Sequence, residues 1–212
     1  MKLINYILIL ILIYFVCCAR TCTEEDSIVE RNEKAALLEL RDSIKQVFGI
    51  DFPDDKLLNA FEATAKQKLI DFSDYMKAAS DSSLDVNFRK KAAEMASQPF
   101  ISTEIDCRNW KREGTNLDFF TLEQLLDEII LKGMAGYVQP IEINVKTPLT
   151  LENDSTYRGS LSFYQQYIPF NNPDLQEIIT GERAIDIYII KKAKIFGEEI
   201  LIIWEAFLGD IY

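Results

Sequence analysis

The sequence predicts an α+β protein in which N-terminal helices pack on a curved antiparallel sheet of about four long strands. Three observations predict this class. Apolar residues recur at helical spacing up to about residue 96, strand-like segments follow Gly133, and the two kinds of segment are separated along the chain. Because a twisted sheet must cover its apolar face, we expect the helices to cover it and to leave a cone-like pocket between them.

The first two predicted helices are long. One runs from about Ser27 to Phe48, with Gly49 at the position where a helix C-cap is expected. The second runs from Asp54 towards Ala79. Its apolar stripe recurs at helical spacing and comprises Leu57, Leu58, Phe61, Ala65, Leu69, Phe72, Tyr75 and Met76.

Shorter segments follow. A helix is predicted from Phe88 to Ala96, and its basic run Asn87-Phe88-Arg89-Lys90-Lys91 can form ion pairs with Glu94 or with other acids. A short strand is predicted over Glu104–Trp110 and a loop over Arg112–Asn116. Thr121 with Gln124 matches a capping box, which opens a last helix that Gly133 stops.

Alternating apolar and polar residues predict the strands. Within Tyr157–Ile168 the pattern places Arg158, Ser160 and Tyr164 on the face opposite Leu161 and Phe163. The predicted order is a strand over Ile141–Lys146, a turn at Asn153-Asp154, the strand Tyr157–Ile168, a loop over Pro169–Gly181, and a hairpin of Arg183–Ala193 and Glu198–Leu208 joined across Gly197.

The N-terminus predicts export. Lys2 precedes a largely apolar stretch over residues 4–16, which is too short to span about 30 Å of hydrocarbon but matches a secretory signal peptide. The three cysteines Cys17, Cys18 and Cys22 follow it at once. They resemble a bacterial lipobox, and Cys18 is the best-placed acceptor for a lipid. The alternative is cleavage near Ala19, which leaves Cys22 and Cys107 able to pair in an oxidising compartment.

These patterns divide the chain into four parts: a signal peptide over 1–18, an acidic tether over 19–30, an N-terminal helical extension over 31–64 and an α+β domain over 65–212.

The net charge of −11 argues against a nucleic-acid partner, because such binding is driven by Lys and Arg. The absence of histidine removes the commonest general base and transition-metal ligand. We expect no cofactor and no metal, since the Asp residues at 71, 74, 81 and 85 lack the spacing of an EF-hand.

Asp186 is the best candidate for a catalytic carboxylate, because it lies in an otherwise apolar strand beside Tyr188. Glu205 is the second choice, and Tyr164 or Tyr167 could donate a hydrogen bond. The alternative is that Asp186 and Glu205 lie on the solvent face of their strands. Aromatic residues could line a ligand pocket or form plain core: Trp110, Phe119, Phe120, Tyr137, Phe163, Tyr188 and Trp204.

The order of elements resembles the NTF2-like (cystatin-like) α+β fold, whose curved sheet wraps N-terminal helices. From about Lys68 to the end, the chain is also similar to a group of Bacteroidota envelope proteins. The similarity is carried by Phe72-Ser73-Asp74-Tyr75-Met76, by residues 84–90 (LDVNFRK) and by residues 204–211 (WEAFLGDI). The resemblance implies an envelope location and no particular biochemical role.

The sequence therefore favours a non-catalytic binding or interaction module, tethered as a lipoprotein to the outer membrane and facing the periplasm or the cell surface. Its expected partner is another envelope protein or a small apolar ligand. Tyr and Trp are enriched at contact hot spots, so the candidate contact residues are Tyr137, Tyr164, Tyr167 and Trp204. The alternative is a small-molecule binder or an enzyme that uses the cone-shaped pocket, with Asp186 as base and Tyr164 as donor.

Overall fold

The computed structural model describes residues 32, 34–36, 39, 52–110, 120–196 and 199–212. The chain divides into two compact units, Asp51–Lys194 with Ile202–Tyr212 and Met1–Ile50 with Ile195–Leu201. The predicted signal peptide, tether and Cys18 lie outside the described residues. Of the helix predicted over 27–48, residues 32, 34–36 and 39 are described and are helical.

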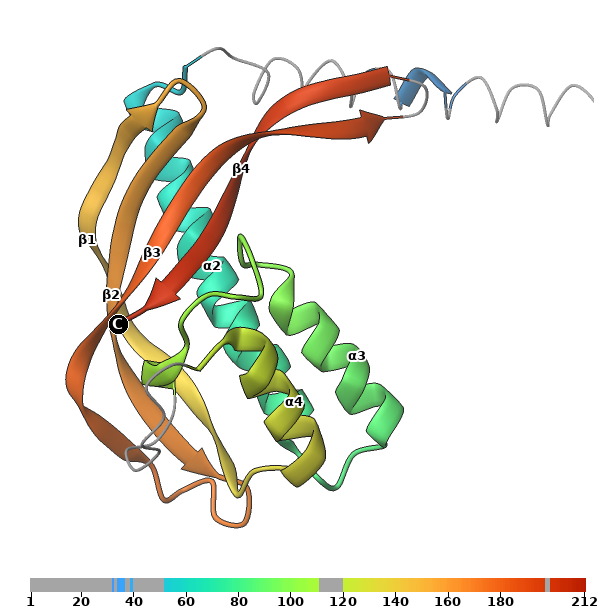
Figure 1. The fold of residues 1–212 in the computed structure, drawn as a ribbon, viewed down its shortest axis with the longest axis vertical. Helices are drawn as coiled ribbons and strands as arrows, with labels where there is room; N and C mark the ends of the chain where they lie inside the picture. The colour runs from blue at the N-terminus through green and yellow to red at the C-terminus, as the bar shows by residue number, and fades with distance from the viewer. Residues whose placement is uncertain (1–31, 33, 37–38, 40–51, 111–119, 197–198) are drawn as a thin grey trace, which may run out of the picture. The chain divides into compact units, whose positions relative to one another are not determined.

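The described residues confirm the α+β class. Helices α2 (Asp55–Ser80), α3 (Val86–Ser97) and α4 (Leu122–Lys132) precede the strands β1 (Gly136–Asn153), β2 (Thr156–Pro169), β3 (Glu177–Phe196) and β4 (Glu199–Ile211). The sheet order is β1-β2-β3-β4, so each strand lies beside the next in sequence (Figure 1). No helix in the described ranges is long and apolar enough to cross a membrane.

Helix α2 forms the layer that packs on the sheet. Its N-cap Asp54 accepts a hydrogen bond from the Leu57 amide, and the predicted apolar stripe supplies its buried apolar residues from Phe61 to Met76. Ser73 Oγ donates to the Val138 carbonyl on β1, and Lys68 Nζ donates to the Ala206 carbonyl on β4, each at 2.8 Å. Residues 55–64 belong to this same continuous helix, which crosses the boundary expected between residues 64 and 65.

Aromatic side chains fill the space between α2 and the sheet. The Phe72 ring lies 4.8 Å from Phe100 and 4.7 Å from Trp110, and the Trp110 ring lies 6.0 Å from Phe163 on β2. A hollow beside this cluster, lined by residues that include Tyr137 and Trp110, has a volume of about 10 Å³, which is about one water. At this place the expected interior pocket is therefore filled by core side chains.

Arg89 joins the ends of two helices. It is 8% exposed, and its Nε donates to the Ala79 carbonyl in the last turn of α2 at 2.8 Å. Its second guanidinium nitrogen donates to the Ile129 and Ile130 carbonyls in the last turn of α4, at 2.8 and 3.3 Å. Carbonyls at a helix C-terminus lack intrahelical donors and attract positive charge. Within the basic run, Lys91 forms the ion pair with Glu94, whereas Arg89 satisfies helix ends.

The strands are longer than the alternating pattern predicted. β1 and β2 extend to the turn at Asp154 and Ser155, which confirms the turn predicted beside Asn153. β3 begins at Glu177, so the connection after β2 is shorter than the loop predicted over Pro169–Gly181. The hairpin turn expected at Gly197 lies outside the described residues.

The strand predicted over Glu104–Trp110 is wrong. The segment forms an isolated bridge between Asp106 and Thr121 and then one turn of 3-10 helix, Arg108–Trp110. The Asp106 carboxylate accepts the Arg108 amide at 2.9 Å, which turns the backbone and ends the pairing. The Asp106 backbone also bonds to the end of β4, at Asp210 and Ile211, so this segment holds the edge of the sheet.

Cys107 is a free thiol in this segment, and it is fully buried. Cys22, its candidate disulfide partner, lies outside the described residues. Burial, assisted by the charges of Asp106 and Asp210, raises the pKa of the Cys107 thiol far above its usual range. Because the thiolate is the reactive form, Cys107 is inert in the folded protein.

We expect iodoacetamide at pH 8 to alkylate Cys107 at least about 100-fold more slowly in the native protein than in urea, because alkylation requires opening of the fold. Peptide mass spectrometry resolves this site from the other three cysteines. Equal rates in buffer and in urea would contradict the buried position.

Candidate functional site

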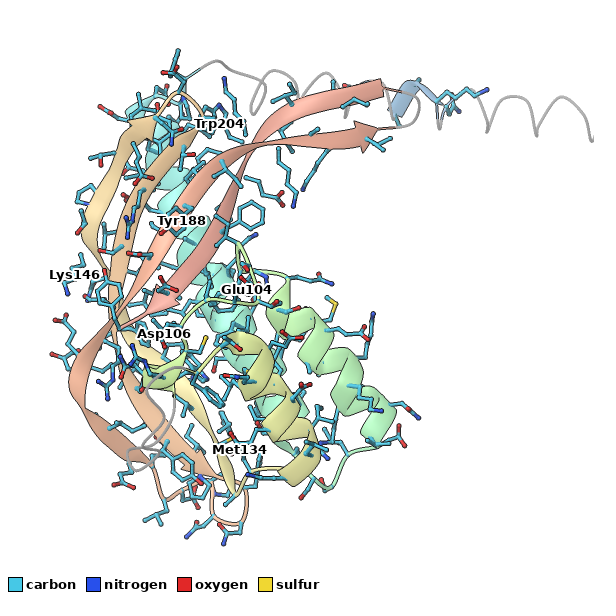
Figure 2. The ribbon with its side chains drawn as sticks, viewed as in Figure 1. Glu104, Asp106, Met134, Lys146, Tyr188 and Trp204 are labelled. Carbon is cyan, nitrogen blue, oxygen red and sulfur yellow. The ribbon has the colours of Figure 1, made fainter. Side chains whose placement is uncertain are left out.

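A polar hollow lies on the face of the sheet that points away from the helices. Ser160 and Asp186 are directly paired across β2 and β3, and they point opposite to Leu161 and Phe163, which face the core. The hollow has a volume of about 370 Å³ and is lined by Thr147, Thr150, Glu152, Arg158, Gly159, Ser160, Asp186 and Tyr212. Figure 2 shows Lys146, next to this lining, on the side of the sheet away from α3 and α4.

An irregularity in β1 shapes the hollow. Thr147 pairs with Ser160 and Thr150 pairs with Arg158, so β1 uses one residue more than β2 over this interval, which is a β-bulge. Opposite the bulge, a Cβ on Gly159 would lie 2.7 Å from the Thr147 carbonyl oxygen, so glycine permits the close approach. The Leu149 amide donates to Glu62 of α2 at 3.0 Å, which fixes the bulge to the core.

Asp186 organises the hollow. It lies on the outer face of the sheet, as the solvent-face alternative expected, but it is only 4% exposed because Arg158, Tyr188 and Tyr212 contact it there. Its Oδ2 accepts from Arg158 at 2.7 Å and from the Tyr188 hydroxyl at 3.3 Å, and its Oδ1 accepts from the Tyr212 hydroxyl at 3.2 Å. The carboxylate is thus held by one cation and two phenols.

The same network changes the ionisation of the phenols. Burial and the negative charge of Asp186 raise the pKa of Tyr188 and of Tyr212 above the usual value, and both remain neutral donors. The hydrogen bond and charge of Asp186 raise the pKa of Arg158, so the guanidinium stays charged. Arg158 also lies over the Tyr188 ring, at 5.5 Å, while its side chain remains 48% exposed.

The tyrosines give a pH-dependent signature. A raised pKa in the folded state means that the neutral phenols stabilise the fold fully below the unfolded pKa of about 10. This contribution is lost as the pH rises through the folded pKa. We expect absorbance at 295 nm to show a part of the tyrosine signal, from Tyr188 and Tyr212, appearing at a higher pH than that of an exposed tyrosine. Asp186→Asn should lower those two pKa values, and an unchanged titration would contradict the network.

The predicted donor Tyr164 does not join this network. Tyr164 is opposite Ile141, whereas Asp186 is opposite Ser160, four residues away along β2. Tyr188 and Tyr212 donate to Asp186 instead. The second candidate acid, Glu205, forms an ion pair with Lys194 at 2.8 Å.

The predicted contact residues are spread over the unit. Tyr164 is 37% exposed, while Tyr137 and Tyr167 are half-buried and Tyr137 lies under Lys77, 4.7 Å from its ring. Trp204 is 2% exposed and packs edge-on against Tyr157, so its assignment as an exposed contact residue is wrong. The other candidate aromatics include core residues Trp110, Phe120 and Phe163, and Phe119 lies outside the described residues.

A second hollow, also of about 370 Å³, lies between α3 and α4. Ala93, Leu126 and Ile130 supply its apolar part, and charged side chains such as Lys90 and Asp127 line it as well. Within the described ranges, no group of three or more His, Cys, Asp or Glu residues could hold a metal ion. Of the two hollows, the one on the sheet has polar side chains held in place by hydrogen bonds, namely those that Asp186 accepts from Arg158, Tyr188 and Tyr212.

No protein-family model matches the chain, and no curated protein matches it. Among solved structures, a protein from Catenulispora acidiphila is similar over 71% of this chain and 91% of that chain, at 10% sequence identity and a TM-score of 0.36. A likeness at this level carries no functional argument, so function is argued from the residues of the hollow.

Proposed function

We propose that this protein is a non-catalytic binding module, tethered to the bacterial cell envelope as a lipoprotein, whose ligand site is the hollow on the outer face of the sheet. One observation carries the proposal: the buried Asp186 holds Arg158 in place while half of the Arg158 side chain stays exposed in a polar hollow. A fixed, exposed donor within a preformed concavity is what a small-molecule site requires.

The geometry favours binding over catalysis. A general base needs a free lone pair directed at a substrate proton. The Asp186 oxygens already accept from Arg158, Tyr188 and Tyr212, and the carboxylate is buried beneath them. Asp186 is therefore a positioning residue, and the groups that face the ligand are Arg158 and the hydroxyls around it.

The filled interior and the polar hollow indicate whether the ligand is apolar or polar. The small apolar ligand expected from the sequence would need a pocket between sheet and helices, where the described cluster around Trp110 leaves about 10 Å³. A polar ligand fits the outer hollow better. We propose an NTF2-like fold for this chain, in which the ligand binds on the outer face of the sheet.

The envelope location rests on the sequence. The apolar stretch over residues 4–16 and the cysteines at 17, 18 and 22 support export and lipid attachment at Cys18. Intact-mass analysis of the protein made in a bacterial host should show an N-terminal diacylglyceryl cysteine, and Cys18→Ser should lack it. An unmodified N-terminus beginning beyond Cys18 would contradict the anchor.

Ligand retention tests the binding role. We expect native mass spectrometry of protein released gently from envelope membranes to show a bound small molecule. Arg158→Met should remove this adduct, because it deletes the exposed donor. Lys90→Met, in the hollow between α3 and α4, is the matched control and should keep the adduct. An adduct that Lys90→Met removes and Arg158→Met retains would contradict the proposed site.

A further inference from the structure

The charges around the outer hollow balance. Arg158 lies 2.7 Å from Asp186 and 3.8 Å from Glu152, so two carboxylates compensate its positive charge. Lys146 lies 5.8 Å from the ring of Tyr212, so a second cation accompanies the two anions. An anionic ligand would meet an arginine that is already neutralised, and a cationic ligand would meet carboxylates that are already paired. The balance favours a neutral ligand.

Nearly every lining side chain is polar. Of the eight lining residues, only Gly159 has no polar side-chain group. Arg158 offers donors, and Glu152 offers an acceptor with a side chain 47% exposed. The Thr147 hydroxyl can donate or accept, and the Thr150 hydroxyl, which donates to the Arg158 carbonyl at 3.5 Å, can still accept. A ligand that satisfies such a lining must carry many groups that both donate and accept, and a polyhydroxyl compound does so.

Tyr212 adds an apolar surface to the polar lining. Its hydroxyl is fixed by Asp186 at 3.2 Å, yet the residue is 51% exposed, so its ring is presented in a set orientation. An aromatic ring with one anchored polar end can cover the C–H groups of a flat polar ligand while its neighbours bond to hydroxyls. The volume of about 370 Å³ is near the lower end of the usual ~300–1,000 Å³ range, so the ligand is small or is the end of a longer chain.

Resting on the proposed binding function, we propose that the outer hollow binds a neutral carbohydrate, with Arg158 and Glu152 bonding to its hydroxyls and Tyr212 packing against one sugar ring. The β-bulge at Thr147–Thr150 sets the width of the site. Asp186 positions Arg158 and Tyr212 and does not itself contact the sugar.

A glycan array probed with the full-length chain in detergent micelles tests this class of ligand. The array should carry neutral glycans beside uronic-acid and sialylated ones, and titration calorimetry with the best free glycan then gives an affinity. We expect binding to neutral glycans, and Arg158→Met should weaken it at least about 10-fold, as expected for loss of a charged hydrogen-bond donor. Thr150→Val removes a hydroxyl from the hollow, so it should weaken binding. Because it keeps the side-chain shape at an exposed position, the protein should stay folded.

Three results would overturn the inference: no binding to any neutral glycan, tighter binding to acidic than to neutral glycans, or an affinity unchanged in both Arg158→Met and Thr150→Val. Lys90→Met is the control and should bind like the wild type. If no neutral glycan binds but native mass spectrometry still shows an adduct that depends on Arg158, the carbohydrate class fails and the binding module stands. If that adduct is also missing, the proposed function fails with it.

Discussion

Arg89→Met is expected to lower the free energy of unfolding by about 3 kcal/mol, since the substitution leaves buried carbonyls without a charged donor. Arg89 bonds to the Ala79 carbonyl of α2 and to the Ile129 and Ile130 carbonyls of α4, so one side chain completes two helix C-termini. Urea unfolding followed by circular dichroism measures the loss. Met fills a similar volume, so the effect reports the lost hydrogen bonds more than a cavity.

Two further variants make this prediction specific. Arg89→Lys keeps the charge, but all three of its donors are on one nitrogen, whereas Arg89 reaches the two helix ends with two separate nitrogens, so this variant should lose part of the stability. Lys90→Met changes the neighbouring exposed lysine and should stay within about 0.5 kcal/mol of the wild type. If Arg89→Met and Lys90→Met unfolded at the same urea concentration, the bridging role would be wrong.

Asp186→Ala is expected to lower the free energy of unfolding by about 2–3 kcal/mol, because it removes the acceptor shared by three donors. This loss of unfolding free energy is smaller than for breaking a fully buried ion pair, since Arg158 is half exposed and water can hydrate its guanidinium once Asp186 is removed. Asp186→Asn keeps the volume and one acceptor oxygen and should cost less. The same urea titration measures both variants.

The control is Glu182→Ala, an exposed acid on the same strand, which should change stability by less than about 0.5 kcal/mol. A change in Asp186→Ala no larger than in Glu182→Ala would mean that the network contributes no stability. In that case Asp186 could not be said to hold Arg158 for a ligand.

Local patterns predicted much of the fold. The apolar stripe from Phe61 to Met76 identified α2, and the Thr121 and Gln124 pair identified the capping box at the start of α4. Alternation placed Arg158 and Ser160 on the face opposite Leu161, which is the face that carries the hollow. These signals are local in sequence, so one chain suffices to recognise them.

The site itself depends on contacts between distant segments. Asp186 was singled out by its apolar neighbours in sequence, but its burial comes from Arg158 on β2 and from Tyr212 at the end of β4. The register that brings these residues together includes a bulge in β1, which the alternating pattern does not reveal. The buried position of Arg89 between two helix ends could not be predicted either, because a lysine-rich run on a helix is typical of a solvated surface.

Amide hydrogen exchange of the full-length chain tests the central claim most directly, by comparing protein in isolated envelope membranes with protein purified in detergent. A ligand in the outer hollow should slow exchange in the segments around Thr147–Thr150 and Arg158–Ser160, which lie against it. Arg158→Met should remove this difference. Protection confined to α3 and α4, or no difference around the hollow, would contradict the claim that this face of the sheet is the binding site.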